Sequence, residues 1–173
     1  MTDVRTRAAQ IKLVIFDVDG VLTDGKLFFD GQGGEYKGFH ARDGLGINLL
    51  RKTGVEVAVI SGRKSPSVAL RMASLGIERV FQGQEDKLAA FDSLRRELKL
   101  EPVQIAHVGD DLLDLPLLRR AGLAVAVADA NPAILPFAHW RTENPGGAGA
   151  AREVCDLIMD AQGNLRRVVE SYY

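Results

Sequence analysis

The stretch KLVIFDVDG, residues 12–20, decides the fold class of this 173-residue chain. A nearly continuous apolar run that ends in acidic residues is typical of a parallel strand, because helices cover both faces of such a strand. Similar β-rich runs recur at residues 56–60, 79–81, 104–108 and 124–127, with helical patterns between them. This alternation predicts an α/β fold with three layers, in which a parallel sheet lies between two layers of helices.

One segment interrupts the alternation directly after the first strand. Residues 26–30 (KLFFD) and 35–40 (EYKGFH) flank a glycine-rich turn, a pattern that predicts a β-hairpin insertion over residues 26–40. The chain shows no internal repeat, linker or low-complexity tract. We therefore expect a single domain over residues 1–173, with residues 163–173 as a C-terminal tail.

Composition excludes several classes of protein. The net charge of −1 provides no field that would attract nucleic acid or an acidic membrane surface. Cys155 is the only cysteine, so neither an intramolecular disulfide nor a cysteine-based zinc site is possible. No apolar run approaches the ~20 residues that span a bilayer, and the first ten residues are polar and charged. We expect a cytoplasmic protein with neither a membrane nor a nucleic acid as partner.

The chemistry of the chain begins with Asp17 and Asp19, at the end of the first strand. Ligands of open parallel sheets bind beyond the carboxyl ends of the strands, and residues two apart in an extended segment point the same way. Two neighbouring carboxylates repel each other unless a cation or a shared proton compensates. Mg²⁺ prefers such oxygen ligands. A solvated acidic turn would show the same pattern, so this motif is not decisive alone.

Three further polar motifs follow later strands. The segment SGR at 61–63 offers a hydroxyl and turn N–H groups that suit a phosphoryl group, although an ordinary helix cap would look alike. Lys87 could neutralise a phosphate, or it could be a solvated surface cation. The segment GDD at 109–111, with Asp114 one helical turn later, could complete an oxygen-rich metal site, or its acidic residues could simply favour a helix N-terminus.

The set of four motifs, in the order D-x-D, S-G, K and G-D-D, resembles the haloacid dehalogenase (HAD) superfamily over nearly the whole chain. The resemblance implies that Asp17 attacks phosphorus and becomes a transient aspartyl-phosphate. It implies that Asp19 protonates the leaving alcohol and then deprotonates the hydrolytic water. Ser61 and Lys87 would hold the phosphoryl oxygens, because this transfer depends on positioning and charge neutralisation.

The same resemblance implies Mg²⁺ as the cofactor. Its ligands would be the carboxylates of Asp17 and Asp110 and the backbone carbonyl of Asp19. Asp111 and Asp114 are expected to lie behind these ligands. Many HAD proteins carry a cap domain between the motifs, but here a hairpin, two helices and a strand fill the intervals, so we expect a capless protein.

Longer strings resemble one branch of the superfamily, the phosphatases of 3-deoxy-D-manno-octulosonate 8-phosphate (KDO-8-phosphate) in lipopolysaccharide biosynthesis. They are DGVLTDG at 19–25, FHARDG at 39–44, SGR at 61–63, GDDLLDLP at 109–116 and GGAGAARE at 146–153. The branch implies a small phosphorylated sugar acid as substrate. It also implies a homotetramer in which hairpins associate and neighbouring subunits complete each active site.

Transfer of the branch's substrate contacts to matching positions predicts a set of binding residues. We expect Arg63 and Arg71, about two helical turns apart, to share a helix face and grip a carboxylate; two solvated arginines are the alternative. The glycine-rich stretch at 146–149 predicts a tight turn near the pocket, and His107 is expected to be a core residue. The full set of predicted substrate-binding residues is Asp19, His40, Ala41, Arg42, Asp43, Gly44, Asn48, Gly62, Arg63, Arg71 and Lys87.

Two other functions remain compatible with the motifs. A phosphatase of a related nine-carbon sugar-acid phosphate would share all of them. A non-catalytic HAD-like assembly module could dispense with Asp19 or Lys87, and both are present here. The sequence therefore favours an enzyme, a phosphoric monoester hydrolase.

Overall fold

The computed structural model describes residues 4–173, and its centre is a six-stranded sheet in the order β5-β4-β1-β6-β7-β8. All neighbouring strands are parallel. The five predicted strands are present within about a residue of their expected bounds. The sixth strand was not predicted, because two residues carry no recognisable pattern. The strands are β1 (Leu13–Phe16), β4 (Glu56–Ile60), β5 (Arg79–Phe81), β6 (Ile105–Gly109), β7 (Leu123–Ala126) and β8 (Trp140–Arg141).

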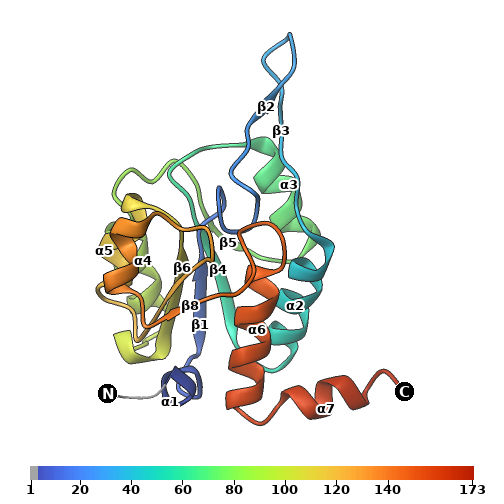
Figure 1. Ribbon diagram of the computed structural model, residues 1–173, viewed down its shortest axis with the longest axis vertical. Helices are drawn as coiled ribbons and strands as arrows, with labels where there is room; N and C mark the ends of the chain where they lie inside the picture. Colours follow the sequence, from blue (N-terminus) through green and yellow to red (C-terminus); the bar gives the residue numbers. More distant parts are fainter. Residues whose placement is uncertain (1–3) are drawn as a thin grey trace.

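Helices cover both faces of the sheet because the strands are apolar on both sides (Figure 1). In β1, Val14 and Phe16 belong to one core cluster, whereas Leu13 and Ile15 belong to the other. This three-layer arrangement confirms the predicted α/β fold. The first cluster includes residues of α1 (Val4–Ala8), α2 (Ala41–Lys52), α3 (Pro66–Ser74) and α6 (Ala150–Ala161), and the second includes residues of α4 (Lys87–Glu97) and α5 (Leu115–Leu118).

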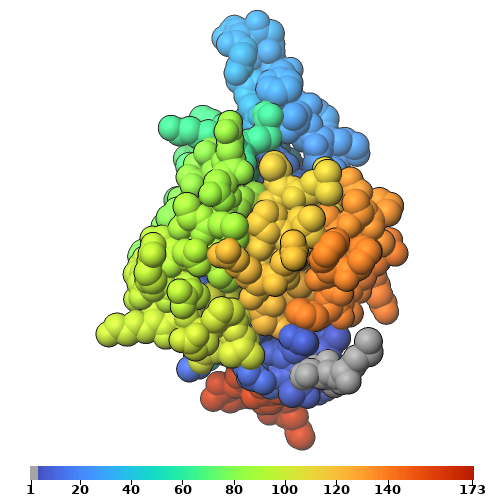
Figure 2. Space-filling view, turned by 90° about the vertical axis from the view of Figure 1, so that its left-hand side faces the viewer, coloured from blue at the N-terminus to red at the C-terminus, as the bar shows by residue number. Residues whose placement is uncertain are grey.

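A hairpin interrupts the chain between β1 and α2. Its strands β2 (Phe28–Phe29) and β3 (Glu35–Tyr36) pair antiparallel, with Phe28 opposite Tyr36. The hairpin stands clear of the body of the molecule (Figures 1 and 2). It rises from the end at which the parallel strands finish, so its base borders the region where a ligand is expected.

The remaining elements are short. They are the 3-10 helices η1 (Pro102–Gln104), η2 (Leu112–Asp114) and η3 (Pro132–Phe137), and the C-terminal helix α7 (Leu165–Glu170). Helix α7 lies at the end of the molecule opposite the hairpin (Figure 1). Within residues 4–173, no helix combines the length and the apolar character that crossing a membrane requires.

Candidate active site

Two acidic side chains meet at the carboxyl end of the sheet because β1 and β6 are neighbours. Phe16 is in register with Val108, so Asp17 and Asp110 leave adjacent strands at the same edge. Asp17 is only 7% exposed, and its backbone N–H donates to the Val108 carbonyl over 3.1 Å. Carboxylate oxygens of Asp17, Asp110 and Asp114 all lie within 4.8 Å of one another. The fold thus brings the D-x-D and G-D-D motifs together.

Lys87 is the buried cation of this cluster. It is the first residue of α4, and its side chain is 1% exposed. Its Nζ atom lies 2.9 Å from the Asp17 carboxylate and 2.7 Å from that of Asp114. Burial alone would lower the pKa of this lysine, but the charges of Asp114 and Asp17 outweigh burial and raise it. Lys87 is therefore a fixed ammonium next to Asp17.

Asp114 holds Lys87 and the G-D-D loop in place. Besides Lys87, its carboxylate contacts His107 Nε2 at 2.9 Å and accepts the N–H of Asp110 at 3.0 Å. Burial opposes ionisation, but the hydrogen bond with His107 and the charges of His107 and Lys87 prevail and lower the pKa of Asp114. These donors occupy its oxygens, which suits a residue behind the metal ligands. His107 is buried as expected, but its contact with Asp114 was not foreseen.

Asp111 also holds the loop in place, and its side chain makes no hydrogen bond to the other carboxylates. Its Oδ1 atom accepts the N–H of Leu112 at 2.8 Å and a side-chain N–H of Asn131 at 2.9 Å. This carboxylate caps the short helix η2, which carries Asp114.

The carboxylates at the end of β1 and β6 fit a divalent cation. Burial and the charge of Asp114 raise the pKa of Asp17 to about 7, and burial and the charge of Asp17 raise the pKa of Asp110 to about 8. Both shifts mean that burial and the neighbouring carboxylates outweigh the positive charge of Lys87. When the carboxylates of Asp17, Asp110 and Asp114 are ionised, their charges and that of Lys87 sum to −2. This excess of negative charge, together with the carboxylate oxygens of Asp17 and Asp110, suits Mg²⁺.

A cavity of about 730 Å³ opens above these residues. Its volume lies within the ~300–1,000 Å³ typical of small-molecule sites. Three leucines with exposed side chains, Leu27, Leu112 and Leu113, stand at its rim. All four motifs contribute to its lining through Asp17, Asp19, Ser61, Gly62, Arg63, Lys87, Asp110, Asp111 and Asp114.

Ser61 reaches the cavity from the end of β4. It is 3% exposed, its N–H donates to the Phe81 carbonyl at 2.8 Å, and its Oγ accepts the N–H of Arg63 at 3.3 Å. The helix that follows begins only at Pro66 and has Ser65 as its N-cap. Ser61 therefore caps no helix, and the helix-cap alternative for this serine is wrong.

The carboxylate of Asp19 contacts the base of the hairpin. Lys37 Nζ lies 2.5 Å from one of its oxygens and Arg63 Nε lies 3.7 Å from the other. Sequence reasoning missed Lys37, because a lysine in a hairpin strand resembles any solvated cation. Its only signal was its place in a segment that follows the D-x-D motif.

Some predicted substrate-binding residues lie outside the cavity. His40, Asp43, Gly44 and Arg71 line a separate pocket of only about 10 Å³. Asp43 is buried, and it accepts the N–H of Arg152 at 2.8 Å. Ala41, Arg42 and Asn48 lie on α2 and are not part of the cavity lining.

The expected pairing of Arg63 with Arg71 is wrong in its geometry. Helix α3 begins at Pro66, so Arg63 lies on the preceding loop and shares no helix face with Arg71. The Arg71 guanidinium instead lies 5.8 Å from the centre of the Phe39 ring. Arg63 alone faces the cavity.

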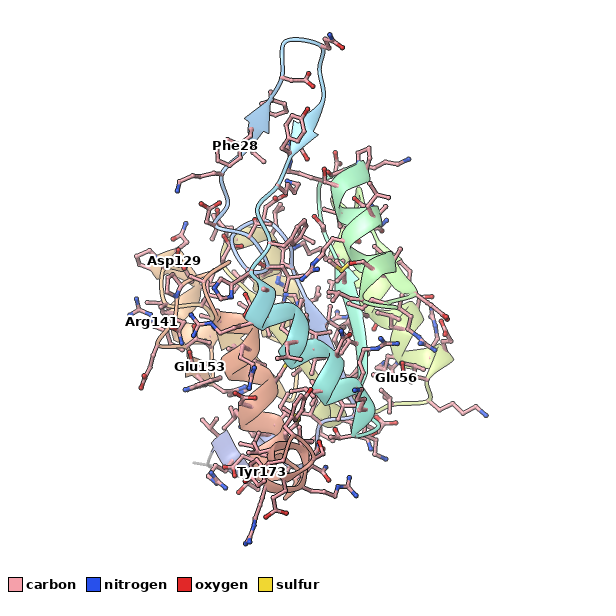
Figure 3. The ribbon with its side chains drawn as sticks, turned by 90° about the vertical axis from the view of Figure 1, so that its right-hand side faces the viewer. Phe28, Glu56, Asp129, Arg141, Glu153 and Tyr173 are labelled. Atoms are coloured by element: carbon pink, nitrogen blue, oxygen red, sulfur yellow. The ribbon has the colours of Figure 1, made fainter. Side chains whose placement is uncertain are left out.

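The glycine-rich turn at 146–149 packs against the loop that carries the acidic pair. The N–H of Gly147 donates to the Val21 carbonyl and that of Gly146 to the Asp129 carboxylate, each over 2.9 Å. A Cβ atom at Gly146 would lie 1.8 Å from the carbonyl oxygen of Gly20. Figure 3 shows Asp129 on the same side of the molecule as α6, the helix that follows this turn.

Comparison with known proteins shows which family the chain resembles. The profile of haloacid dehalogenase-like hydrolases matches residues 73–153. The chain is 50% identical to 3-deoxy-D-manno-octulosonate 8-phosphate phosphatase of Yersinia pestis, over 94% of this chain and 87% of that protein. It is 49% identical to the enzyme of the same name from Escherichia coli K12, with the same coverage.

Solved structures agree with these relatives. The crystal structure of the Yersinia pestis phosphatase superposes with a TM-score of 0.94 at 49% identity, covering 95% of this chain and 89% of that one. The phosphatase of Moraxella catarrhalis, crystallised with a magnesium ion, a phosphate ion and KDO, superposes with a TM-score of 0.96 at 39% identity. That match covers 98% of both chains.

Proposed function

Because the chain belongs to the 3-deoxy-D-manno-octulosonate 8-phosphate phosphatases, within the haloacid dehalogenase-like hydrolases, we propose that it hydrolyses KDO-8-phosphate to KDO and inorganic phosphate, as a step of lipopolysaccharide biosynthesis. Two observations together support this proposal. The chain is 50% identical to the Yersinia pestis phosphatase over 94% of its length, and all four motifs line one cavity. The reaction is the hydrolysis of a phosphoric monoester.

We assign the attack on phosphorus to Asp17. Its carboxylate oxygen would form a bond to phosphorus while the bond from phosphorus to the sugar oxygen breaks, which leaves an aspartyl-phosphate on Asp17. Lys87, 2.9 Å from this carboxylate, holds it in place and balances part of the charge. Ser61, buried in the cavity lining, would donate its hydroxyl to a phosphoryl oxygen.

Magnesium is the cofactor of this reaction. The carboxylates of Asp17 and Asp110 and the backbone carbonyl of Asp19 would hold it. When bound, it neutralises negative charge on the transferred phosphoryl group. The raised pKa values of Asp17 and Asp110 support this assignment, because they mark two carboxylates that need a cation to ionise together.

We assign the proton transfers to Asp19. Its carboxyl proton would pass to the sugar oxygen as that oxygen leaves phosphorus. The resulting carboxylate would then take a proton from the water that attacks the aspartyl-phosphate. Water oxygen replaces Asp17 on phosphorus, which releases inorganic phosphate and restores both aspartates.

For the sugar acid itself, Arg63 is the cation best placed for recognition. Its side chain is 47% exposed and lines the cavity, so it can meet a carboxylate in bidentate fashion. The residues at 40–44, Asn48 and Arg71 do not line the cavity of their own chain, so any contact they make needs a different arrangement of chains. We propose a homotetramer, in which a neighbouring subunit covers the leucine rim.

A panel of phosphate esters tests the substrate. We expect KDO-8-phosphate to have a higher kcat/KM than nine-carbon sugar-acid phosphates, and glucose 6-phosphate to be far poorer, because it lacks the carboxylate that Arg63 would meet. Asp17→Asn should abolish turnover of every ester and leave the circular dichroism spectrum unchanged. A nine-carbon acid at the top of the panel would refute the assigned sugar, and an active Asp17→Asn enzyme would refute the mechanism.

A further inference from the structure

Four charged side chains form an ionic ring at the base of the hairpin. Lys37 Nζ lies 2.5 Å from Asp19 Oδ1 and 3.3 Å from Glu35 Oε1. Arg63 Nη2 lies 2.7 Å from Glu35 Oε2, and Arg63 Nε lies 3.7 Å from Asp19 Oδ2. The two cations and two carboxylates balance each other. The ring joins the loop after β1, the hairpin strand β3 and the loop after β4.

The two cations of the ring differ in their freedom to move. The side chain of Lys37 is 0% exposed, whereas that of Arg63 is 47% exposed. A buried ammonium is costly unless carboxylates or other acceptors pair with it, so Lys37 cannot leave Asp19 and Glu35 without a penalty. Arg63 can exchange its partners for a ligand or for water. Lys37 is therefore the permanent member of the ring.

The hairpin end of the ring is itself fixed. Ser67 on α3 donates its hydroxyl to the backbone carbonyl of Glu35 at 2.8 Å. Lys37 thus connects Asp19 to a strand that is held against α3. The Asp19 carboxylate is 19% exposed. Lys37 holds its Oδ1 atom, whereas Arg63 lies 3.7 Å from Oδ2 and can leave it for a ligand, so Oδ2 is the oxygen that can carry a proton.

We propose that Lys37 is a positioning residue: it holds the carboxyl group of Asp19 in the one orientation from which that group can exchange a proton with the leaving oxygen and then with water. The inference rests on the proposed role of Asp19 and extends it to the hairpin. The hairpin then has a part in chemistry within one chain, in addition to any part in assembly.

A pair of esters with different leaving groups tests this inference. A leaving group that departs readily as an anion, such as p-nitrophenolate, needs little protonation, whereas an alkyl alkoxide needs it strongly. In Lys37→Met, which keeps the length and loses the charge, we expect kcat/KM for an alkyl phosphate to fall about 100-fold. For p-nitrophenyl phosphate we expect a loss of less than about threefold.

Matched variants separate positioning from a general structural defect. Lys37→Arg keeps the cation and should restore most of the alkyl phosphate activity. Lys26→Met removes an exposed hairpin lysine whose partner is Asp24, and it should leave both esters unaffected. Lys37→Gln is a second neutral variant, measured in parallel with Lys37→Met. The test needs only one of the two to fold, which circular dichroism checks.

The outcomes are distinct. A selective loss on the alkyl ester supports the inference, and an equal loss on both esters, or no loss on either, overturns it. Because neither ester is a sugar acid, the comparison does not depend on which sugar acid has the highest kcat/KM in the substrate panel.

Discussion

At the scale of single residues, the candidate site depends on buried charges that fix one another. Lys87 is held between Asp17 and Asp114, and Asp114 is held in turn by His107 and by the N–H of Asp110. Side chains in such a network need no rearrangement during the reaction, which is the basis of electrostatic preorganisation. The charges of this network do not sum to zero. The excess negative charge lies on Asp17 and Asp110, where Mg²⁺ would bind.

This imbalance predicts a pH-dependent stability of the metal-free protein. Folding raises the pKa of Asp17 from 3.8 to about 7 and that of Asp110 from 3.8 to about 8. The folded state therefore binds more protons than the unfolded state between these values, so stability falls as pH rises through that window. We expect the melting temperature in EDTA to drop by on the order of 5 °C between pH 6.5 and 8.5.

Mg²⁺ should reverse this loss at pH 8.5 and have a smaller effect at pH 6.5, because protons compete for the same carboxylates. The melting temperatures are compared only from pH 6.5 upward because folding lowers the pKa of His139. Below that pH, this histidine makes stability rise with pH, which opposes the effect of the two aspartates. Asp110→Asn is the control and should flatten the dependence. A pH-independent melting temperature of the metal-free protein would contradict the prediction.

At the scale of elements, the glycine-rich turn before α6 supports the loop that carries Asp17 and Asp19. Backbone approaches backbone here: a Cβ at Gly146 would meet the Gly20 carbonyl, and one at Gly147 would lie 2.4 Å from backbone atoms of Thr23 and Asp24. Neither partner is a flexible side chain that could move aside. The spacing between turn and loop thus depends on the absence of side chains.

We predict that Gly146→Ala destabilises the protein by about 1–3 kcal/mol, as overpacking of a close contact does, and lowers kcat by displacing the loop. Chemical denaturation and steady-state kinetics measure the two effects. Gly31→Ala is the matched control, because a Cβ at Gly31 meets nothing within 4 Å. Equal stability and activity of both variants would show that the turn tolerates a side chain.

At the scale of the whole molecule, the exposed aromatic residues of the hairpin remain without an explanation within one chain. Phe28, Phe29 and Tyr36 are 53%, 62% and 62% exposed, and Figure 3 shows Phe28 on the hairpin, away from the body. Leu27 at the hairpin base also joins the apolar rim of the cavity. Apolar groups gathered in this way usually mark an interface.

We predict that the protein is a homotetramer with closed symmetry, built through the hairpins. Light scattering at micromolar concentration should give four times the 18.8 kDa mass of one chain. The double variant Phe28→Ser, Phe29→Ser should give smaller species. Val103→Ser, a change at another exposed apolar residue outside the hairpin, should leave the mass unaltered. A wild-type mass of a single chain would refute this assembly.

The sequence by itself determined the three-layer fold and the convergence of the four motifs. The apolar run at 13–16 and its four counterparts predict parallel strands, because strand burial on both faces requires residues that are apolar throughout. In a parallel sheet all carboxyl ends share one edge. Asp17, Ser61 and Asp110 therefore had to meet, whatever the details of packing.

Only the tertiary structure decided which side chains contact one another across that edge. Lys37 meets Asp19 because of how the hairpin folds back on the loop, and His107 meets Asp114 because of the turn into η2. The later start of α3 separates Arg63 from Arg71, which a helical pattern alone had joined. Local periodicity records which face of an element is buried, whereas contacts between elements depend on their angles and loops, for which a single sequence carries no repeating signal.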